Sequence, residues 1–216
     1  MEIVNIEDKA FMGILLAAVE AYPSKYCGGR KPKGASPEGE VHGLLFGQRI
    51  MKNGETTVYN VTLAVSNQIV LERSGDGISV SSVHIDRIRE VTELFPAYSL
   101  LGFFHSHPYP KADFHKTGCV EPSDTDIENA VSMAEAEGDT MLDLIIGITR
   151  LERRSWVVPD FPKPHMIHAC CDKYKYTLAC CVTSEDEDKD DESECYLPVD
   201  NLICTTAAGM VNTDLM

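Results

Sequence analysis

The chain has 216 residues, of which 44% are hydrophobic and 25% are charged, as expected for a globular protein with a sizeable core. Its 34 acidic residues against 19 basic ones give a net charge of −15, which disfavours nucleic-acid binding because phosphate contacts need a positive surface. The longest apolar stretches are too short to span a bilayer, and the N-terminal residues lack the basic flank and apolar run of a signal peptide. We therefore expect a cytoplasmic protein with neither a nucleic acid nor a membrane as partner.

The acidic residues are unevenly distributed. Residues 185–194 contain eight acids and one lysine, a net charge of −7. Such a run predicts a solvated loop, and docking of a basic partner is the alternative interpretation.

The eight cysteines predict free thiols, because a cytoplasmic chain with an adequate core has no need of disulfides. The absence of a Cys-x-x-Cys motif argues against a structural zinc ribbon. In the pairs Cys170-Cys171 and Cys180-Cys181, neighbouring strand residues face opposite sides, so we expect one cysteine of each pair to be buried.

The first half of the chain predicts two helices and a hairpin. Apolar residues at helical spacing indicate a helix over 8–22, which Pro23 ends. Strands are predicted over 41–50 and 56–65, joined by a turn at Asn53-Gly54. A second helix is expected over 83–94, just before Pro96.

The second half predicts further alternation of strands and helices. The aromatic-rich run 98–104 indicates a buried strand, 124–136 has helical spacing, and 141–149 reads as another strand. Two more strands are expected over 166–172 and 174–183. This alternation predicts an α/β fold.

The buried strand leads into His105-Ser106-His107-Pro108. Residues two apart on a strand face the same side, so His105 and His107 can offer two imidazole nitrogens to one metal ion. Pro108 has no backbone N–H and ends the strand after the second histidine. Two histidines at a strand end can equally be surface or hydrogen-bonded residues, so this motif alone does not establish a metal site.

A second motif, Ser123-Asp124-Thr125-Asp126, opens the helix over 124–136. It resembles a capping box with Ser123 as the N-cap residue and Asp126 at the third helical position. Such a cap would also aim the Asp126 carboxylate, which could complete a His-His-Asp set. Three protein ligands with one open position are typical of catalytic zinc.

The order of these motifs resembles the JAMM family of zinc peptidases, also called MPN+ or JAB. The family motif is a distant Glu, then His-x-His-Pro, then Ser-x-x-Asp. Here Glu40 opens the sequence Glu-Val-His-Gly-Leu-Leu-Phe-Gly, which matches the family pattern Glu-x-x-Gly-Leu-x-x-Gly. The resemblance covers roughly residues 8–160.

The resemblance implies a role for each motif residue. His105, His107 and Asp126 would bind one Zn²⁺ per chain, with a water in the fourth position. Glu40 would be the general base, taking a proton from that water and passing it to the leaving amine. Ser123 would donate a hydrogen bond to the oxyanion.

The resemblance also implies the fold: a three-layer α/β sandwich of the JAMM/MPN, cytidine deaminase-like type with a central mixed sheet. We expect residues 1–160 to form the catalytic core. Residues 161–216, with the acidic loop 185–194, would be a C-terminal extension packed on it.

The segment between His107 and Ser123 departs from the family pattern. It comprises fifteen residues, 108–122, and is longer than the family's usual spacing. It predicts a surface loop that closes over the site or contacts substrate. His115 and Cys119 within it could in principle reach the metal, although a fourth protein ligand would block the open position.

The function implied by the resemblance is hydrolysis of a peptide or isopeptide bond after the C-terminus of ubiquitin or a ubiquitin-like protein. Bacterial relatives act on small ubiquitin-like or sulfur-carrier proteins, so the substrate and any conjugation-system partners stay open. One alternative is a non-catalytic MPN scaffold within a protein complex. Another is a RadC-like protein linked to DNA metabolism, which the acidic composition disfavours.

Overall fold

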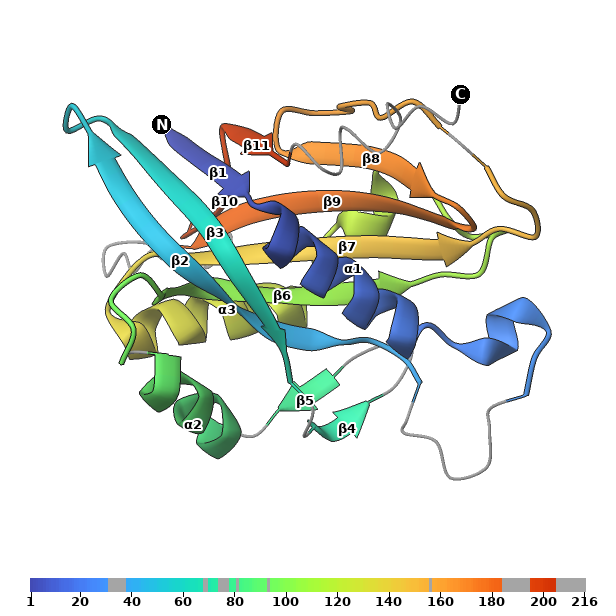
Figure 1. The fold of residues 1–216 in the computed structure, drawn as a ribbon, viewed down its shortest axis with the longest axis horizontal. Helices are drawn as coiled ribbons and strands as arrows, with labels where there is room; N and C mark the ends of the chain where they lie inside the picture. Colours follow the sequence, from blue (N-terminus) through green and yellow to red (C-terminus); the bar gives the residue numbers. More distant parts are fainter. Residues whose placement is uncertain are drawn as a thin grey trace.

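The structure is a computed structural model that describes residues 1–30, 38–67, 70–73, 78–80, 82–92, 94–155, 157–183 and 195–204 (Figure 1). Its elements in chain order are β1 (Glu2–Ile6), α1 (Asp8–Ala21), the 3₁₀ turn η1 (Ser24–Cys27), β2 (His42–Lys52), β3 (Thr56–Ser66), β4 (Val70–Arg73), β5 (Ile78–Val80), α2 (Ser82–Thr92), β6 (Ser99–Pro108), η2 (Gly118–Val120), α3 (Asp124–Glu137), β7 (Met141–Arg150), β8 (Met166–Cys171), β9 (Tyr174–Thr183), β10 (Tyr196–Pro198) and β11 (Asn201–Ile203).

A mixed sheet organises the molecule. Within the described residues it has nine strands in the order β10-β9-β7-β6-β2-β3-β1-β11, with β8 also paired to β9. Strand β6 is central, antiparallel to β2 and parallel to β7. The predicted α/β class with a mixed sheet is therefore confirmed.

The two ends of this sheet approach one another. Strand β10 lies at one end of the strand order and β11 at the other, yet only Val199 and Asp200 separate them in the chain. Asp200 binds β1, since its Oδ2 accepts from the Glu2 backbone N–H at 2.6 Å and its own N–H donates to the Glu2 carbonyl at 2.9 Å. The sheet thus curls towards a barrel.

Helices pack on both faces of the sheet. Helix α1 crosses the front face in Figure 1, where Phe11 and Ile14 join a buried cluster that includes Leu45 of β2. Leu44, the neighbour of Leu45, points to the opposite face and packs in a second cluster with Ala130 of α3. Because adjacent strand residues alternate between faces, α1 and α3 cover opposite sides of β2.

The helices and longer strands lie where the sequence predicted them, with bounds that differ by a few residues. Both hairpin strands form, and the turn between them has positive φ at Asn53 (55°) and Gly54 (72°), as an Asn-Gly hairpin turn requires. Strands β1, β4, β5, β10 and β11 were not predicted. They are three to five residues long, too short for their apolar pattern to distinguish a strand from a loop.

The prediction for the cysteine pairs was right for one pair and wrong for the other. Cys170 is buried and Cys171 is partly exposed, but Cys180 and Cys181 are both buried. They face opposite sides of β9 and both sides are covered there, because Cys181 packs in the cluster that contains Tyr196 of β10. All eight cysteines lie within the described residues, and each is a free thiol.

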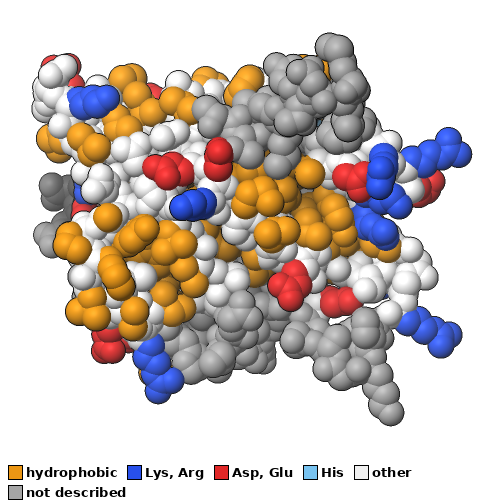
Figure 2. Space-filling model, in the orientation of Figure 1, with side chains coloured by type: hydrophobic (Ala, Val, Ile, Leu, Met, Phe, Trp, Pro, Cys, Tyr) orange, Lys and Arg blue, Asp and Glu red, His pale blue; other side chains and the backbone are white. Residues whose placement is uncertain are grey.

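The segment expected to be a C-terminal extension contributes β8, β9, β10 and β11 to the same sheet. The acidic run 185–194 lies outside the described residues. Within the described ranges, no helix has the length and apolar character needed to cross a membrane. On the face shown in Figure 2, Lys and Arg side chains are scattered and lie beside acidic ones.

Buried His168 makes stability depend on pH. Its Nδ1 lies 2.8 Å from the hydroxyl of Thr177, which donates its own proton to the Lys116 carbonyl at 2.7 Å. The imidazole Nδ1 must therefore be the donor in the first contact. Burial, reinforced by the positive charge of Lys175, lowers the pKa of His168 from 6.5 to about 4.

We predict that the free energy of unfolding falls as the pH drops from 6.5 to about 4, and that His168→Asn reduces this slope. The unfolded chain takes up a proton at this histidine below pH 6.5, whereas the folded chain stays neutral there until about pH 4. Denaturant unfolding of metal-free protein across this range measures the slope. The matched change at exposed His115, His115→Asn, should keep the wild-type slope; equal slopes for the two variants would contradict the prediction.

Candidate metal centre

The end of β6 presents two histidines to the same side. Strand pairing places His105 opposite His42 of β2 and Ile145 of β7, so the backbone here is held on both sides. The intervening Ser106 points away and accepts a hydrogen bond from the Val41 N–H at 2.9 Å. The imidazoles of His105 and His107 lie with ring centroids 4.9 Å apart.

Helix α3 places the third candidate ligand, Asp126, beside the two histidines. Ser123 is the N-cap residue, and the reciprocal hydrogen bonds of a capping box are both present. The Ser123 hydroxyl accepts from the Asp126 N–H at 3.2 Å, and Asp126 Oδ2 accepts from the Ser123 N–H at 2.8 Å and its hydroxyl at 2.7 Å. The cap thereby fixes the orientation of the carboxylate.

These three side chains form a group of possible metal ligands, with donor atoms within 4.8 Å of one another. Asp126 Oδ1 lies 3.7 Å from His105 Nε2, and Asp126 Oδ2 lies 3.6 Å from His107 Nε2. Ligands about 2.0–2.1 Å from a tetrahedral Zn²⁺ are roughly 3.4 Å apart. The two contacts above are slightly longer and involve different oxygens of Asp126, and a set with one atom from each residue lies within 4.8 Å. His105 Nε2 is buried and has no hydrogen-bond partner in the structure. The donor set and this unsatisfied nitrogen fit a metal ion.

A buried carboxylate lies behind His105. Asp143 of β7 is fully buried, and its Oδ1 lies 3.1 Å from His105 Nδ1, while its Oδ2 accepts a hydrogen bond from the Tyr196 hydroxyl at 2.7 Å. Neither residue was predicted as part of the site from the sequence. The available signal was a charged residue inside the apolar run 141–148, which is unusual for a central strand.

The electrostatics of the site favour positive charge at its centre. Burial lowers the pKa of His105, but the charge of Asp143 and its contact with the ring outweigh burial and raise that pKa to about 9. Burial raises the pKa of Asp126, but the contacts with His107, His105 and Ser123 have the larger combined effect. Together they hold that pKa well below its usual value.

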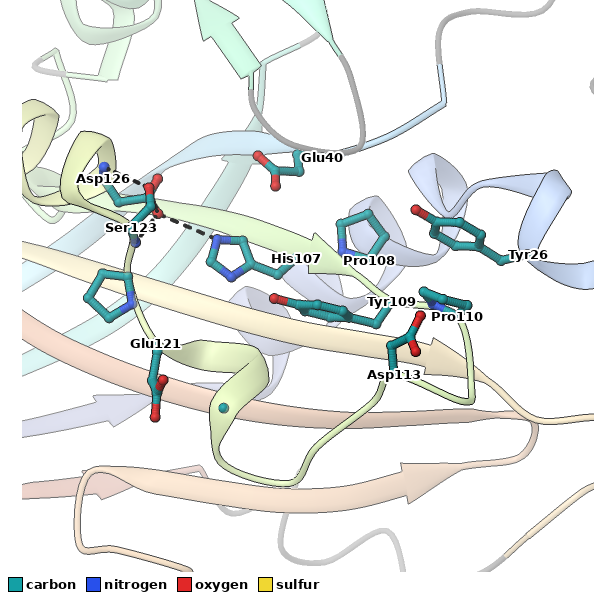
Figure 3. Close-up of a pocket in the computed structure, with 12 residues that line it drawn as sticks. Tyr26, Glu40, His107, Pro108, Tyr109, Pro110, Asp113, Glu121, Ser123 and Asp126 are labelled. Atoms are coloured by element: carbon teal, nitrogen blue, oxygen red, sulfur yellow. Dashed lines mark hydrogen bonds and ion pairs between the residues drawn. The ribbon is translucent and has the colours of Figure 1, made fainter.

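Glu40 lies two residues before the first residue of β2 and is only 8% exposed. It is held beside the histidines because Val41, the next residue, also accepts a hydrogen bond from the Ser106 N–H at 2.9 Å. Figure 3 shows the Glu40 carboxylate in the cavity that His107 and Asp126 line. The structure therefore brings all five predicted site residues, Glu40, His105, His107, Ser123 and Asp126, to one place.

The cavity beside these residues has a volume of about 680 Å³. The predicted loop between β6 and α3 forms much of its lining, through Tyr109, Asp113 and Glu121 (Figure 3). Tyr26 of η1 also lines the cavity. Four acidic residues in the lining give the cavity a negative character, namely Glu40, Asp113, Glu121 and Asp126.

Several contacts hold this loop in place. The Tyr109 N–H donates to the Ile148 carbonyl at 2.9 Å, and the Tyr22 hydroxyl donates to the Tyr109 carbonyl at 2.6 Å. Further along, Cys119 is buried against Gly147 of β7, where a Cβ would lie 2.5 Å from the Cys119 carbonyl oxygen. Glycine at position 147 is therefore what lets the loop pack this closely on the sheet.

Neither His115 nor Cys119 belongs to the group of metal ligands among the described residues. The Cys119 thiol accepts a hydrogen bond from the His115 backbone N–H at 3.0 Å, and His115 is exposed. Cys119 thus has a packing role, and the open position of the candidate metal site is not blocked by either side chain.

Comparison with models of known protein families finds no match, and comparison with curated proteins finds no similar sequence. The functional argument therefore depends on the geometry of this site and on the motif resemblance.

We predict that Gly147→Ala lowers the free energy of unfolding by about 1–3 kcal/mol and exposes the loop, because the added Cβ would overlap Cys119. Denaturant unfolding gives the first quantity, and hydrogen exchange of the amides around η2 gives the second. Gly118→Ala is the matched control in the same loop, since a Cβ there meets nothing nearer than 3.8 Å. Equal stability and exchange for the two variants would contradict the proposed packing.

Proposed function

We propose that this protein is a zinc-dependent peptidase of the JAMM type. It hydrolyses a peptide or isopeptide bond after the C-terminus of ubiquitin or a ubiquitin-like protein. The observation that carries the proposal is that His105, His107 and Asp126 converge with Glu40 and Ser123 at one cavity. The proposal includes the family's three-layer α/β sandwich, for which helices α1 and α3 on opposite faces of the sheet are supporting evidence.

Zinc is the metal that we propose for this donor set. Two imidazole nitrogens and one carboxylate match the ligand types of catalytic zinc sites, whereas calcium and magnesium prefer oxygen ligands alone. Zinc held by these residues would lower the pKa of a bound water to about 7 and polarise the scissile carbonyl.

Glu40 is placed to move the proton in this reaction. Its carboxylate is nearly buried and shares the cavity with two of the ligands, so it can accept a proton from the attacking water. It would then deliver that proton to the nitrogen of the leaving amine. A carboxylate that serves both steps needs no second acid.

Ser123 would stabilise the oxyanion by donating its hydroxyl proton. In the structure that proton is directed to Asp126 Oδ2, at 2.7 Å. A hydroxyl has a single proton to donate, so binding of the substrate carbonyl would require it to rotate away from Asp126. The N-cap position keeps the Ser123 Oγ beside the cavity throughout, because the backbone contact to Asp126 is retained.

The cavity is suited to a peptide segment. Aromatic and proline side chains from Tyr26, Pro108, Tyr109 and Pro110 provide apolar lining, while Asp113 and Glu121 provide acidic groups. A cavity of about 680 Å³ is large enough for several residues of an extended chain terminus. We also propose a cytoplasmic location, which the eight free thiols support.

We predict that purified protein contains about one zinc ion per chain and that His107→Ala lowers this content strongly, because one of three ligands is removed. Elemental analysis after extensive dialysis measures the stoichiometry. His115→Ala, a change at a histidine outside the site, should leave it unchanged. Full hydrolytic activity in metal-free protein would contradict the zinc proposal.

We predict that Glu40→Gln keeps the zinc but slows hydrolysis by about 100- to 10,000-fold, the usual contribution of a general base. The assay is cleavage of a panel of fusions in which ubiquitin, ubiquitin-like proteins or sulfur-carrier proteins precede a reporter. Glu135→Gln changes an exposed glutamate of α3 that does not line the cavity; it is the matched control and should keep the wild-type rate.

The outcome of this panel also separates the candidate functions. Cleavage of one fusion class by wild-type protein, lost in Glu40→Gln, identifies both the enzyme and its substrate. Retained cleavage in Glu40→Gln would show that another group is the base. Failure of the zinc-loaded protein on every fusion would favour the MPN scaffold, and specific DNA binding would favour the RadC-like alternative.

A further inference from the structure

The carboxylate of Asp143 is an unusual group to find in the centre of the sheet. Asp143 has no exposed surface and lies on β7 next to Phe103 of β6 and Cys181 of β9. Burying a charged group is costly unless it is paired and hydrogen-bonded. Each of its two oxygens faces one partner, with Oδ1 3.1 Å from His105 Nδ1 and Oδ2 2.7 Å from the Tyr196 hydroxyl.

This contact determines which nitrogen of His105 is available for a metal. In the neutral imidazole, an Nδ1–H directed at Asp143 would leave the lone pair on Nε2, and Nε2 is the atom that lies 3.7 Å from Asp126. Metal-binding histidines commonly donate their other ring N–H to a carboxylate, which fixes both the tautomer and the ring orientation. The 3.1 Å ion pair between His105 Nδ1 and Asp143 Oδ1 brings together the same two groups.

Tyr196 connects Asp143 to the C-terminal part of the chain. It lies on β10, only 8% exposed, in the same buried cluster as Ala130 of α3. Its hydroxyl donates to Asp143 Oδ2 and so prevents that oxygen from turning toward another donor. A chain of contacts therefore runs from β10 through Asp143 to His105.

We propose that Asp143 and Tyr196 are positioning residues of the metal centre, a proposal that rests on the zinc site of the proposed function. Asp143 holds His105 in the ligating tautomer, and Tyr196 holds Asp143. The short strand β10, which lies outside the JAMM-like residues 8–160, thus contributes to metal affinity. A purely structural role would be served better by an apolar side chain at position 143, since an apolar residue has no charge to desolvate.

The test measures zinc affinity, by chelator competition on metal-free protein, in two variants and their combination. Asp143→Asn keeps the side-chain shape but removes the carboxylate, and we expect zinc affinity to fall about 10- to 100-fold. Tyr196→Phe keeps the ring and removes one hydrogen bond, for which we expect a loss of about three- to tenfold. In the double variant the tyrosine change should have little further effect, because it acts through Asp143.

Tyr176→Phe is the matched control. Tyr176 is a fully buried tyrosine on β9 whose hydroxyl has no hydrogen-bond partner in the structure, and it packs in the cluster on the α1 face. It should retain wild-type zinc affinity. NMR of the zinc-loaded protein gives a second readout: the Nδ1–H of His105 should be protected from exchange in wild type and lose that protection in Asp143→Asn.

The outcomes separate this inference from the proposed function. Wild-type protein that binds no zinc would overturn both. Wild-type protein that binds zinc, with Asp143→Asn and Tyr196→Phe within about twofold of Tyr176→Phe, would overturn only the positioning role. If Asp143→Asn does not fold, the comparison of Tyr196→Phe with Tyr176→Phe decides the question.

Discussion

Two hydrogen bonds between the start of β2 and the end of β6 determine the layout of the site. The Val41 N–H donates to the Ser106 hydroxyl and the Ser106 N–H donates to the Val41 carbonyl, both at 2.9 Å. Because strand side chains alternate, a Ser106 that makes the first bond leaves His105 and His107 pointing to the opposite face. The same contact holds Glu40, the residue before Val41, beside them. Two interactions of about 1 kcal/mol each therefore orient the proposed base and two ligands together.

The position of Asp126, the third candidate ligand, depends on a different constraint, the packing of α3. Ala130 of α3 is fully buried against the sheet, which places the first turn of the helix over the end of β6. The capping box at Ser123 then uses Asp126 Oδ2, so that Oδ1 is left facing His105. Local helix-capping chemistry and long-range packing thus act on the same carboxylate. This explains why a motif that reads as an ordinary cap can also supply a metal ligand.

Sequence reasoning found the elements and side chains whose signals are local. The period of the strands, the Asn53-Gly54 turn and the Ser123 cap are each specified within a few residues, and all three are present. The pairing of Asp143 with Tyr196 joins residues 53 apart in the chain and has no local signature. The near-closure of the sheet has none either, because it depends on β1 and β11, strands of five and three residues. What the sequence could not provide was the set of contacts that only the assembled sheet creates.

The long segment between β6 and α3 shows how an insertion can become part of a site. Lengthening a loop costs little entropy, about 0.6 kcal/mol for each doubling, and this cost is modest beside the contacts that the loop makes. The Tyr109 N–H donates to the Ile148 carbonyl, and the Lys116 carbonyl accepts a hydrogen bond from the Thr177 hydroxyl. Cys119 packs on Gly147. A segment fixed at these three points forms one wall of the cavity that Glu40 also lines. The candidate metal ligands come from β6 and α3, so changes in this wall can alter the shape of the cavity without altering the ligand group.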